Sequence, residues 1–141
     1  MATNHFKNAY DNVITLIKSS YSRFKQPGRI VIRDVLTLNE TGYEDGIMIT
    51  PISDTLLGER VTGRDDQFVV ELTYYKKYYP EIDYDDLTEM SENLIDLFNT
   101  NRHTTYWHYL GVESVEYSIE VPDDVEMQGF TMTLIIQQGK Y

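Results

Sequence analysis

Apolar residues along the chain change their spacing several times, and each spacing predicts one kind of element. Near the start they recur every three or four positions, which lines one face of a helix of about five turns. These positions are Phe6, Tyr10, Val13, Ile17, Tyr21 and Phe24. Thr3 or Asn4 can cap this helix, and the sequence Gln26-Pro27-Gly28 ends it, because proline disfavours helix in the residue before it.

Two later patterns predict a long strand and a second helix. Residues 67–75 alternate strongly apolar and more polar positions, which is typical of a strand with one apolar face. After a loop that contains Pro80, apolar residues return at helical spacing, with Asp85 or Asp86 as the cap of a helix that ends at about residues 99–102. The apolar face of this helix consists of Leu87, Met90, Leu94, Leu97 and Phe98.

Shorter apolar segments predict the rest of a sheet. They are residues 29–38, residues 47–52, residues 59–62 as a weaker candidate, and a closing hairpin of residues 107–121 and 126–138. Pro51 cannot donate to a strand ladder and indicates an edge or an end, and residues 63–66 have the composition of a tight turn. The predicted fold is a single α+β domain over residues 1–141, mainly an antiparallel sheet with two helices packed on one face.

Composition sets limits on the class of protein. A chain of 141 residues can bury one core without a disulfide or a structural metal, and zero cysteines exclude a thiolate metal site or a thiol nucleophile. No apolar run approaches the roughly 20 residues that cross a bilayer, and residues 1–10 lack the layout of a secretion signal. We therefore expect a soluble protein made in a cytoplasm.

Charge is distributed unevenly along the chain. The net charge of −11 argues against general binding to nucleic acid or to an anionic membrane. Residues 1–38 hold six basic and two acidic side chains, whereas seven acids and no base lie between Glu81 and Asp96. A basic front end on an acidic body can attract a second copy of the same chain.

Candidate chemical sites are weak. His103 and His108 are five positions apart without an obvious third ligand, so we interpret them as polar or interfacial imidazoles in a loop and not as a metal site. Ser53-Asp54 has no nucleophile setting around it, and spacing alone does not select a catalytic pair among 23 acids, so a hydrolase stays an alternative. We expect no catalytic residue, metal or cofactor. A calcium-loop count lacks the required glycine and covers Glu81, Asp83, Asp85 and Glu92, which a solvated helix start explains as well.

The most unusual segment is YYKKYYP, residues 74–80. Tyrosine combines a large ring with a polar tip and is enriched in protein interfaces. The same rings could cover the end of a sheet, with Tyr74 in its core, or stack on single-stranded bases. Tyr106, Trp107 and Tyr109 form a second aromatic group.

The order of these elements resembles the tail-terminator family of long-tailed bacteriophages, also called tail-completion or neck proteins. An N-terminal amphipathic helix ends in a Pro/Gly turn before a strand. The segment DDQFVVELTYYKKYYPEIDYDDLTEMSENLIDLF resembles the polar turn, long strand, proline-containing loop and second helix of the family, and GVESVEYSIEVPDDVEMQGFTMTLII resembles its closing hairpin.

The resemblance implies a structural virion protein and not an enzyme. Family members form a ring, usually of six copies, that caps the head-proximal end of the tail tube, stops tube polymerisation and meets the head connector, while DNA passes through the bore without specific binding. The expected partners are therefore other copies of the chain, the tail tube protein and the head-completion protein, and the expected location is the virion neck, with assembly in the host cytoplasm. The alternatives are another head–tail joining protein, at head closure or at the sheath end, and a small-ligand or protein-binding α+β domain.

Three sets of residues are candidates for these contacts. The subunit interface candidates are Lys7, Lys18, Arg23, Lys25, Arg29, Tyr75, Tyr78, Tyr79, Tyr106 and Trp107. The candidates for an acidic bore or rim are Glu113, Glu116, Glu120, Asp123, Asp124 and Glu126. The alternative, of equal weight, is that these acids keep an outer face soluble. The loop of residues 39–46 is expected to become ordered only on docking.

Overall fold

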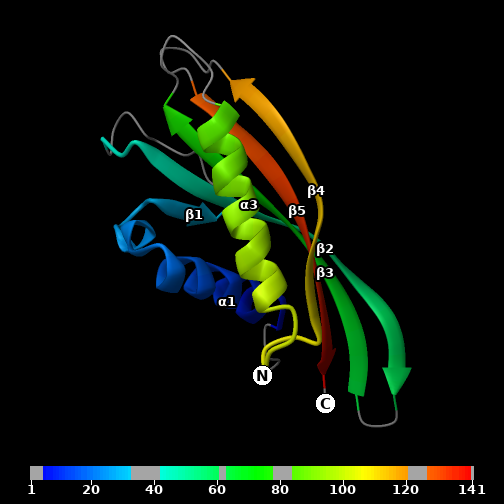
Figure 1. The fold of residues 1–141 in the computed structure, drawn as a ribbon. Helices are drawn as coiled ribbons and strands as arrows, with labels where there is room; N and C mark the ends of the chain where they lie inside the picture. Colours follow the sequence, from blue (N-terminus) through cyan, green and yellow to red (C-terminus); the bar gives the residue numbers. More distant parts are fainter. Residues whose placement is uncertain (1–4, 33–41, 61–62, 78–83, 121–126, 141) are drawn as a thin grey trace.

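A computed structural model describes residues 5–32, 42–60, 63–77, 84–120 and 127–140. They form a five-stranded sheet in the order β1-β2-β3-β5-β4, with two helices against it (Figure 1). The strands are β1 (Ile30–Ile32), β2 (Asp45–Arg60), β3 (Gly63–Lys77), β4 (Tyr109–Glu120) and β5 (Met127–Lys140), and the helices are α1 (His5–Ser20), the 3₁₀-helix η1 (Ser22–Lys25) and α3 (Tyr84–Thr100). Only β1 is parallel to its neighbour, so the predicted α+β class with a mainly antiparallel sheet is confirmed.

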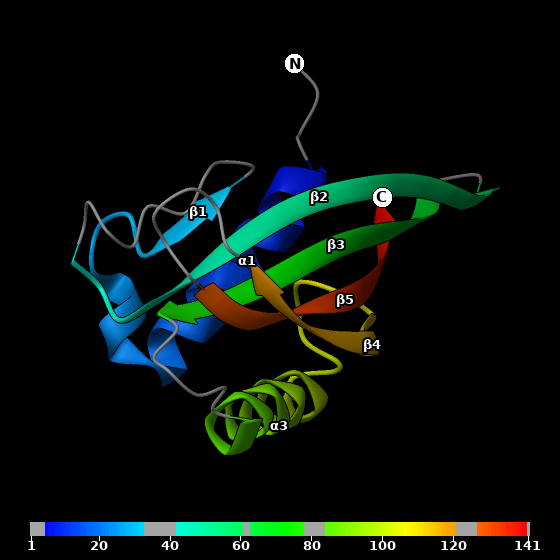
Figure 2. The same ribbon diagram turned by 90° about the horizontal axis from the view of Figure 1, so that it is seen from above.

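One face of the sheet carries the core. In β3, the alternation that predicted a strand places Phe68, Val70, Leu72 and Tyr74 on this buried face, and β5 adds a matching row that ends at Ile136. Both helices cover the same face: α1 lies over β2 and β3, and α3 lies over β5 and β4 (Figures 1 and 2). The predicted placement of two helices on one face is therefore confirmed.

The first helix is shorter than the sequence pattern predicts. Its face from Ala9 to Ile17 is buried, and Phe6 stacks on Phe68 with ring centroids 4.7 Å apart. The helix ends at Ser20, because Tyr21 adopts an extended backbone, and Phe24 reaches the core from η1 instead. Serine-rich sequence at this point competes for backbone hydrogen bonds and lowers helix propensity. The cap proposed at Thr3 or Asn4 lies outside the described residues.

The second helix matches its prediction closely. α3 begins at Tyr84, one residue before the expected cap, and its first-turn acids favour the positive end of the helix dipole. Leu87, Met90, Leu94 and Phe98 are buried as their spacing predicts. The Ser91 hydroxyl also lies 2.7 Å from the Tyr117 hydroxyl of β4, which ties the helix to the edge of the sheet.

Strands β2 and β3 are longer than predicted. Residues 63–66 belong to β3 and pair with β2, and residues 64–66 also pair with β5, so the prediction of a tight turn there was wrong. Neighbouring strands on both sides hold these polar residues extended, and Asp66 is buried. Pro51 lies inside β2, whose outer edge is lined by β1 only from Ile47 to Ile49. An edge position accommodates proline, as expected.

The far end of the β2–β3 hairpin projects past the helices (Figures 1 and 2). We call it the arm; it consists of residues 52–60 of β2 and residues 63–69 of β3. Within the described residues, no helix is both long and apolar enough to cross a membrane.

Candidate functional site

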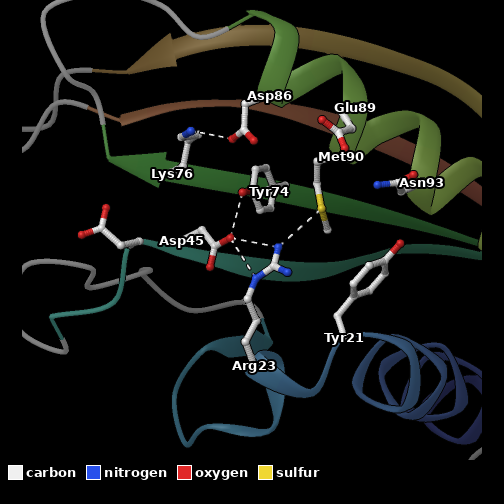
Figure 3. A pocket seen from close by; sticks show the side chains of 10 residues that line it. Tyr21, Arg23, Asp45, Tyr74, Lys76, Asp86, Glu89, Met90 and Asn93 are labelled. Atoms are coloured by element: carbon white, nitrogen blue, oxygen red, sulfur yellow. Dashed lines mark hydrogen bonds and ion pairs between the residues drawn. The ribbon is translucent and has the colours of Figure 1, made fainter.

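A polar cleft of about 400 Å³ opens between α3 and the segment that joins α1 to the sheet (Figure 3). It lies where η1, the start of β2, the end of β3 and the first turns of α3 meet. Its lining residues are Tyr21, Arg23, Glu44, Asp45, Tyr74, Lys76, Asp86, Glu89, Met90 and Asn93.

Asp45 is the centre of the cleft floor. It is the first residue of β2, and its side chain accepts hydrogen bonds from three groups. Arg29 binds Oδ1 through Nε at 3.1 Å and also through Nη2, Tyr74 donates its hydroxyl to Oδ2 at 2.8 Å, and Arg23 Nη2 lies 3.1 Å from Oδ2. The backbone reinforces the arrangement, because the amide of Ile47 donates to the carbonyl of Arg29 at 2.9 Å. This buried network fastens the η1–β1 connection to the sheet.

The floor is not suited to acid–base chemistry near neutral pH. Burial alone would raise the pKa of Asp45, but hydrogen bonds from Arg29 and Tyr74 and the charge of Arg23 outweigh burial and lower that pKa. Burial and the Asp45 carboxylate both raise the pKa of the Tyr74 hydroxyl. Asp45 therefore stays ionised and Tyr74 stays protonated, whereas a general acid or base needs a pKa near the working pH.

The rim of the cleft is charged. Lys76 forms an ion pair with Asp86, and Arg23 Nη2 also lies 3.6 Å from the sulfur of Met90. Glu44 and Glu89 add two more carboxylates, so acids outnumber bases among the lining residues. No serine, threonine, cysteine or histidine lines the cleft within the described residues. The arrangement is suited to holding a polar group.

The predicted basic interface residues separate into surface and buried groups. Lys7 and Lys25 are exposed and Lys18 is half-exposed, and Lys7 pairs with Asp11 one helical turn away. Arg23 lines the cleft. Arg29 is buried and holds Asp45, so it has little surface to offer a neighbouring subunit, and its role is internal.

The predicted aromatic interface residues also separate. Tyr106 is 52% exposed, but Tyr75 and Trp107 are buried, so they offer little surface to a partner. Trp107 instead donates from its indole nitrogen to the carbonyl of Asn101 at 2.9 Å. Tyr78 and Tyr79 lie outside the described residues.

The predicted acidic rim is described only in part. Glu113 and Glu116 are exposed on β4, and Glu120 ends that strand. Asp123, Asp124 and Glu126 lie outside the described residues.

The loop of residues 39–46 is described from residue 42 onward. There Asp45 and Gly46 belong to β2, and the carbonyl of Glu44 accepts a hydrogen bond from the amide of Lys77 at 3.0 Å. For these three residues the expected ordering only on docking was wrong, because the Arg29 pair and the β3 ladder already hold them.

The structure does not assemble metal ligands from the described residues of the His103–His108 pair or of the calcium-loop count. The imidazole of His103 hydrogen bonds through Nδ1 to the carbonyl of His108 at 2.5 Å. Asp85 and Glu92 of the calcium-loop count lie in α3, and Glu81 and Asp83 lie outside the described residues. Among the residues with described placement, no three histidine or acidic side chains come together as a metal site.

The helices at the two ends of the sheet differ in charge, although the exposed acids Glu44 and Asp54 lie on the β2 side and the exposed Arg102 follows α3. Helix α1 and η1 lie at the β1–β2 end and carry Lys7, Lys18, Arg23 and Lys25. At the other end, neither α3 nor β4 contains a lysine or arginine. The exposed acids of these two elements are Asp85, Glu89, Glu92, Asp96, Glu113 and Glu116.

Two features of the site were missed from the sequence. One sequence feature could have predicted the Arg29–Asp45 pair. Asp45 comes directly before the apolar strand segment GIMI, so it lies close to the core and needs a partner there. No sequence feature predicts a second pocket, which lies between α1 and the α3–β4 connection, because its walls come from residues about 85 positions apart. No protein-family model matches the chain, and no curated protein matches it either.

Proposed function

We propose that the protein is a structural component of a phage neck that acts as a tail terminator. In this role several copies, usually six in the family it resembles, form a ring on the head-proximal end of the tail tube, stop tube polymerisation and join the tube to the head connector. The order of elements supports the proposal, because an N-terminal helix, a long strand, a second helix and a closing hairpin follow the pattern of that family on one sheet.

The observation that carries the proposal is the separation of charge across the sheet. A closed ring of identical subunits requires two different, complementary patches on each copy. The basic α1–η1 end and the acidic α3–β4 end are such a pair. Attraction between unlike patches also orients the subunits head to tail.

The same distribution suits a ring through which DNA passes. Glu113 and Glu116 on β4 are exposed, and carboxylates that face a bore repel phosphate. The polar cleft agrees with a structural role, because Asp45 and Tyr74 are held in protonation states that do not support proton transfer.

Charge reversal tests the ring directly. One variant carries Lys18→Glu and Lys25→Glu, and a second carries Glu89→Lys and Glu92→Lys. Each variant alone should fail to assemble, whereas an equal mixture should restore a ring of alternating copies, measured by native mass spectrometry and negative-stain microscopy. Glu89→Asp with Glu92→Asp changes the same two exposed side chains but keeps their charge, so this control should assemble as the wild type does. Failure of the mixture to assemble where the wild type does would remove the charge pairing from the proposal.

The tube completes the test. Wild-type protein added to polymerising tail tube subunits of the same phage should bind one end and shorten the tubes. Tubes of unchanged length without a cap would overturn the tail-terminator proposal, and binding to the head connector alone would favour a head-closure role.

The polar cleft favours one alternative, a small-ligand-binding domain. Its volume of about 400 Å³ falls in the range of ligand sites, although its rim is more charged than most such sites. A rise in melting temperature with a small charged ligand, lost in Asn93→Leu, would support this alternative.

A further inference from the structure

The arm carries three large aliphatic side chains on its surface. Ile52, Leu56 and Leu57 are 47%, 48% and 51% exposed. All three belong to β2 beyond the segment that β1 lines. Folded proteins usually guard an edge strand with charge, proline or a cover, because an exposed apolar edge promotes association.

Two of these side chains occupy β-bulges. The β2–β3 register shifts between Pro51 and Ser53, and again between Leu56 and Gly58, so Ile52 and Leu57 are the extra residues of β2. A bulge re-aims the side chain at the extra position. Large aliphatic residues at both positions gain little burial within the monomer, which indicates that they serve a contact outside it.

A pocket of matching chemistry lies on the same chain. It has a volume of about 220 Å³ and lies between α1 and the connection from α3 to β4. Its lining residues are Asn12, Thr15, Leu16, Ser19, Asn101, Thr104, Tyr106 and Trp107. None of them is charged, although 25% of the chain is. We call it the uncharged pocket.

Hydrogen bonds hold the wall of the uncharged pocket in place. The amide of Thr104 donates to the carbonyl of Trp107 at 3.3 Å, and the amide of Tyr106 donates to the Thr104 hydroxyl at 3.0 Å. Gln138 of β5 donates to the carbonyl of Tyr106 at 2.7 Å. A wall that is already ordered loses little conformational entropy when a partner binds.

The two features fit each other. Leu16 and Tyr106 supply most of the apolar surface for an aliphatic side chain, and the largely buried Trp107 adds only its small exposed part. The hydroxyl and carboxamide groups around them can donate and accept, as the backbone of an incoming edge strand requires. The arm of one chain cannot enter its own pocket, because β3 pairs with β2 along the whole arm and the arm points away from the helices (Figures 1 and 2).

We propose that the arm of one copy docks, through Leu57 and Leu56, in the uncharged pocket of a second copy. This contact rests on the self-association in the proposed function and names its apolar part. Arm and pocket are different surfaces of one chain, so the contact is heterologous and is compatible with a ring.

Two variants separate the halves of the contact. Leu57→Asp places a charge on the arm, and Thr15→Trp fills the mouth of the pocket; both positions are exposed, and melting curves check that both variants fold. Each should weaken self-association by at least about tenfold in sedimentation velocity. Thr55→Asp is the matched control. Thr55 is exposed and next to Leu56, but adjacent side chains of a strand point to opposite faces, so this variant should associate as the wild type does.

A mixture of the two variants gives the sharpest result. The intact arm of Thr15→Trp can enter the intact pocket of Leu57→Asp, but no further copy can add, so the mixture should stop at a one-to-one pair. A photo-crosslinker at position 57 of the wild type should join Leu57 to the peptide that contains Tyr106 and Trp107.

Three outcomes overturn the contact. They are wild-type association in both variants, crosslinks from position 57 to another part of the chain or only to another virion protein, and a wild type that stays monomeric at all concentrations. The tube-capping experiment judges the proposed function separately, because a cap built through other surfaces would still shorten tubes.

Discussion

Removing the charge of Asp45 should weaken the fold more than any other single isosteric change in the polar cleft. Asp45→Asn keeps the shape of the side chain but leaves the Arg29 guanidinium, whose side chain is 10% exposed, without its anion. Breaking a buried ion pair in this way costs about 3–5 kcal/mol. We expect a value near the lower limit, because Arg29 still donates to the backbone carbonyl of residue 45 and to Gln26. A domain of this size has about 5–15 kcal/mol in total, so the loss is a large share.

Urea unfolding measures this loss conveniently. The chain has one tryptophan, Trp107, and its burial makes its fluorescence a probe of the folded state. A loss of about 3 kcal/mol with a slope of about 2 kcal/mol per molar lowers the midpoint by roughly 1.5 M. Asp11→Asn is the matched control, since it breaks the exposed Lys7 pair by the same substitution and should leave the midpoint nearly unchanged.

The pH dependence gives a second check on the same reasoning. The pKa of Asp45 is lower in the folded protein than in the unfolded chain, so its contribution to stability is complete above the ordinary aspartate pKa near 4. That contribution disappears as the pH falls through the lower folded pKa. The difference between wild type and Asp45→Asn should therefore shrink in acid. A difference below about 1 kcal/mol at neutral pH, or one that stays constant into acid, would refute the buried-pair account.

Three other substitutions test the packing of the sheet and the partner of Asp45. Gly129→Ala should lower the free energy of unfolding by about 1–3 kcal/mol or more, because its Cβ would lie 1.9 Å from the backbone carbonyl oxygen of Tyr74. Gly111→Ala meets only the end of the Tyr109 side chain, which can rotate, so a loss as large as that of Gly129→Ala in thermal melts would contradict this reading. Tyr74→Phe should flatten the fall in stability above about pH 10, since the raised pKa of Tyr74 makes the unfolded chain release a proton that the native state keeps. Equal slopes for both proteins in alkaline melts would remove Tyr74 from that role.

The sequence predicts the elements whose pattern is local. The alternation from Phe68 to Tyr74 and the helical spacing from Leu87 to Phe98 each state which face is buried, and the structure confirms both. One core needs one apolar face per element, so these patterns also predict two helices on one side of a sheet.

What the sequence does not predict depends on neighbours distant in the chain. Residues 63–66 have the composition of a turn, yet β2 holds them extended and β5 pairs with residues 64–66 from the other side. Tyr21 and Phe24 keep the helical spacing of apolar residues, but α1 ends before them at Ser20. The spacing of side chains alone does not show where the backbone leaves the helix. The polar cleft needs Arg23, Asp45 and Asp86 together, and no spacing rule joins three such positions.

The position of β5 has a consequence for how copies of the protein can be made. It is the last strand of the sheet to leave the ribosome, yet it lies between β3 and β4 and pairs with both. Until β5 is inserted, β4 has no strand in the described sheet to pair with. A nascent chain can therefore form the β2 side of the sheet before the β4 side, and the α3–β4 patch of the proposed ring contact is complete only after β5 has paired. In the proposed ring, the order of synthesis would therefore delay the pairing of subunits until β5 is in place.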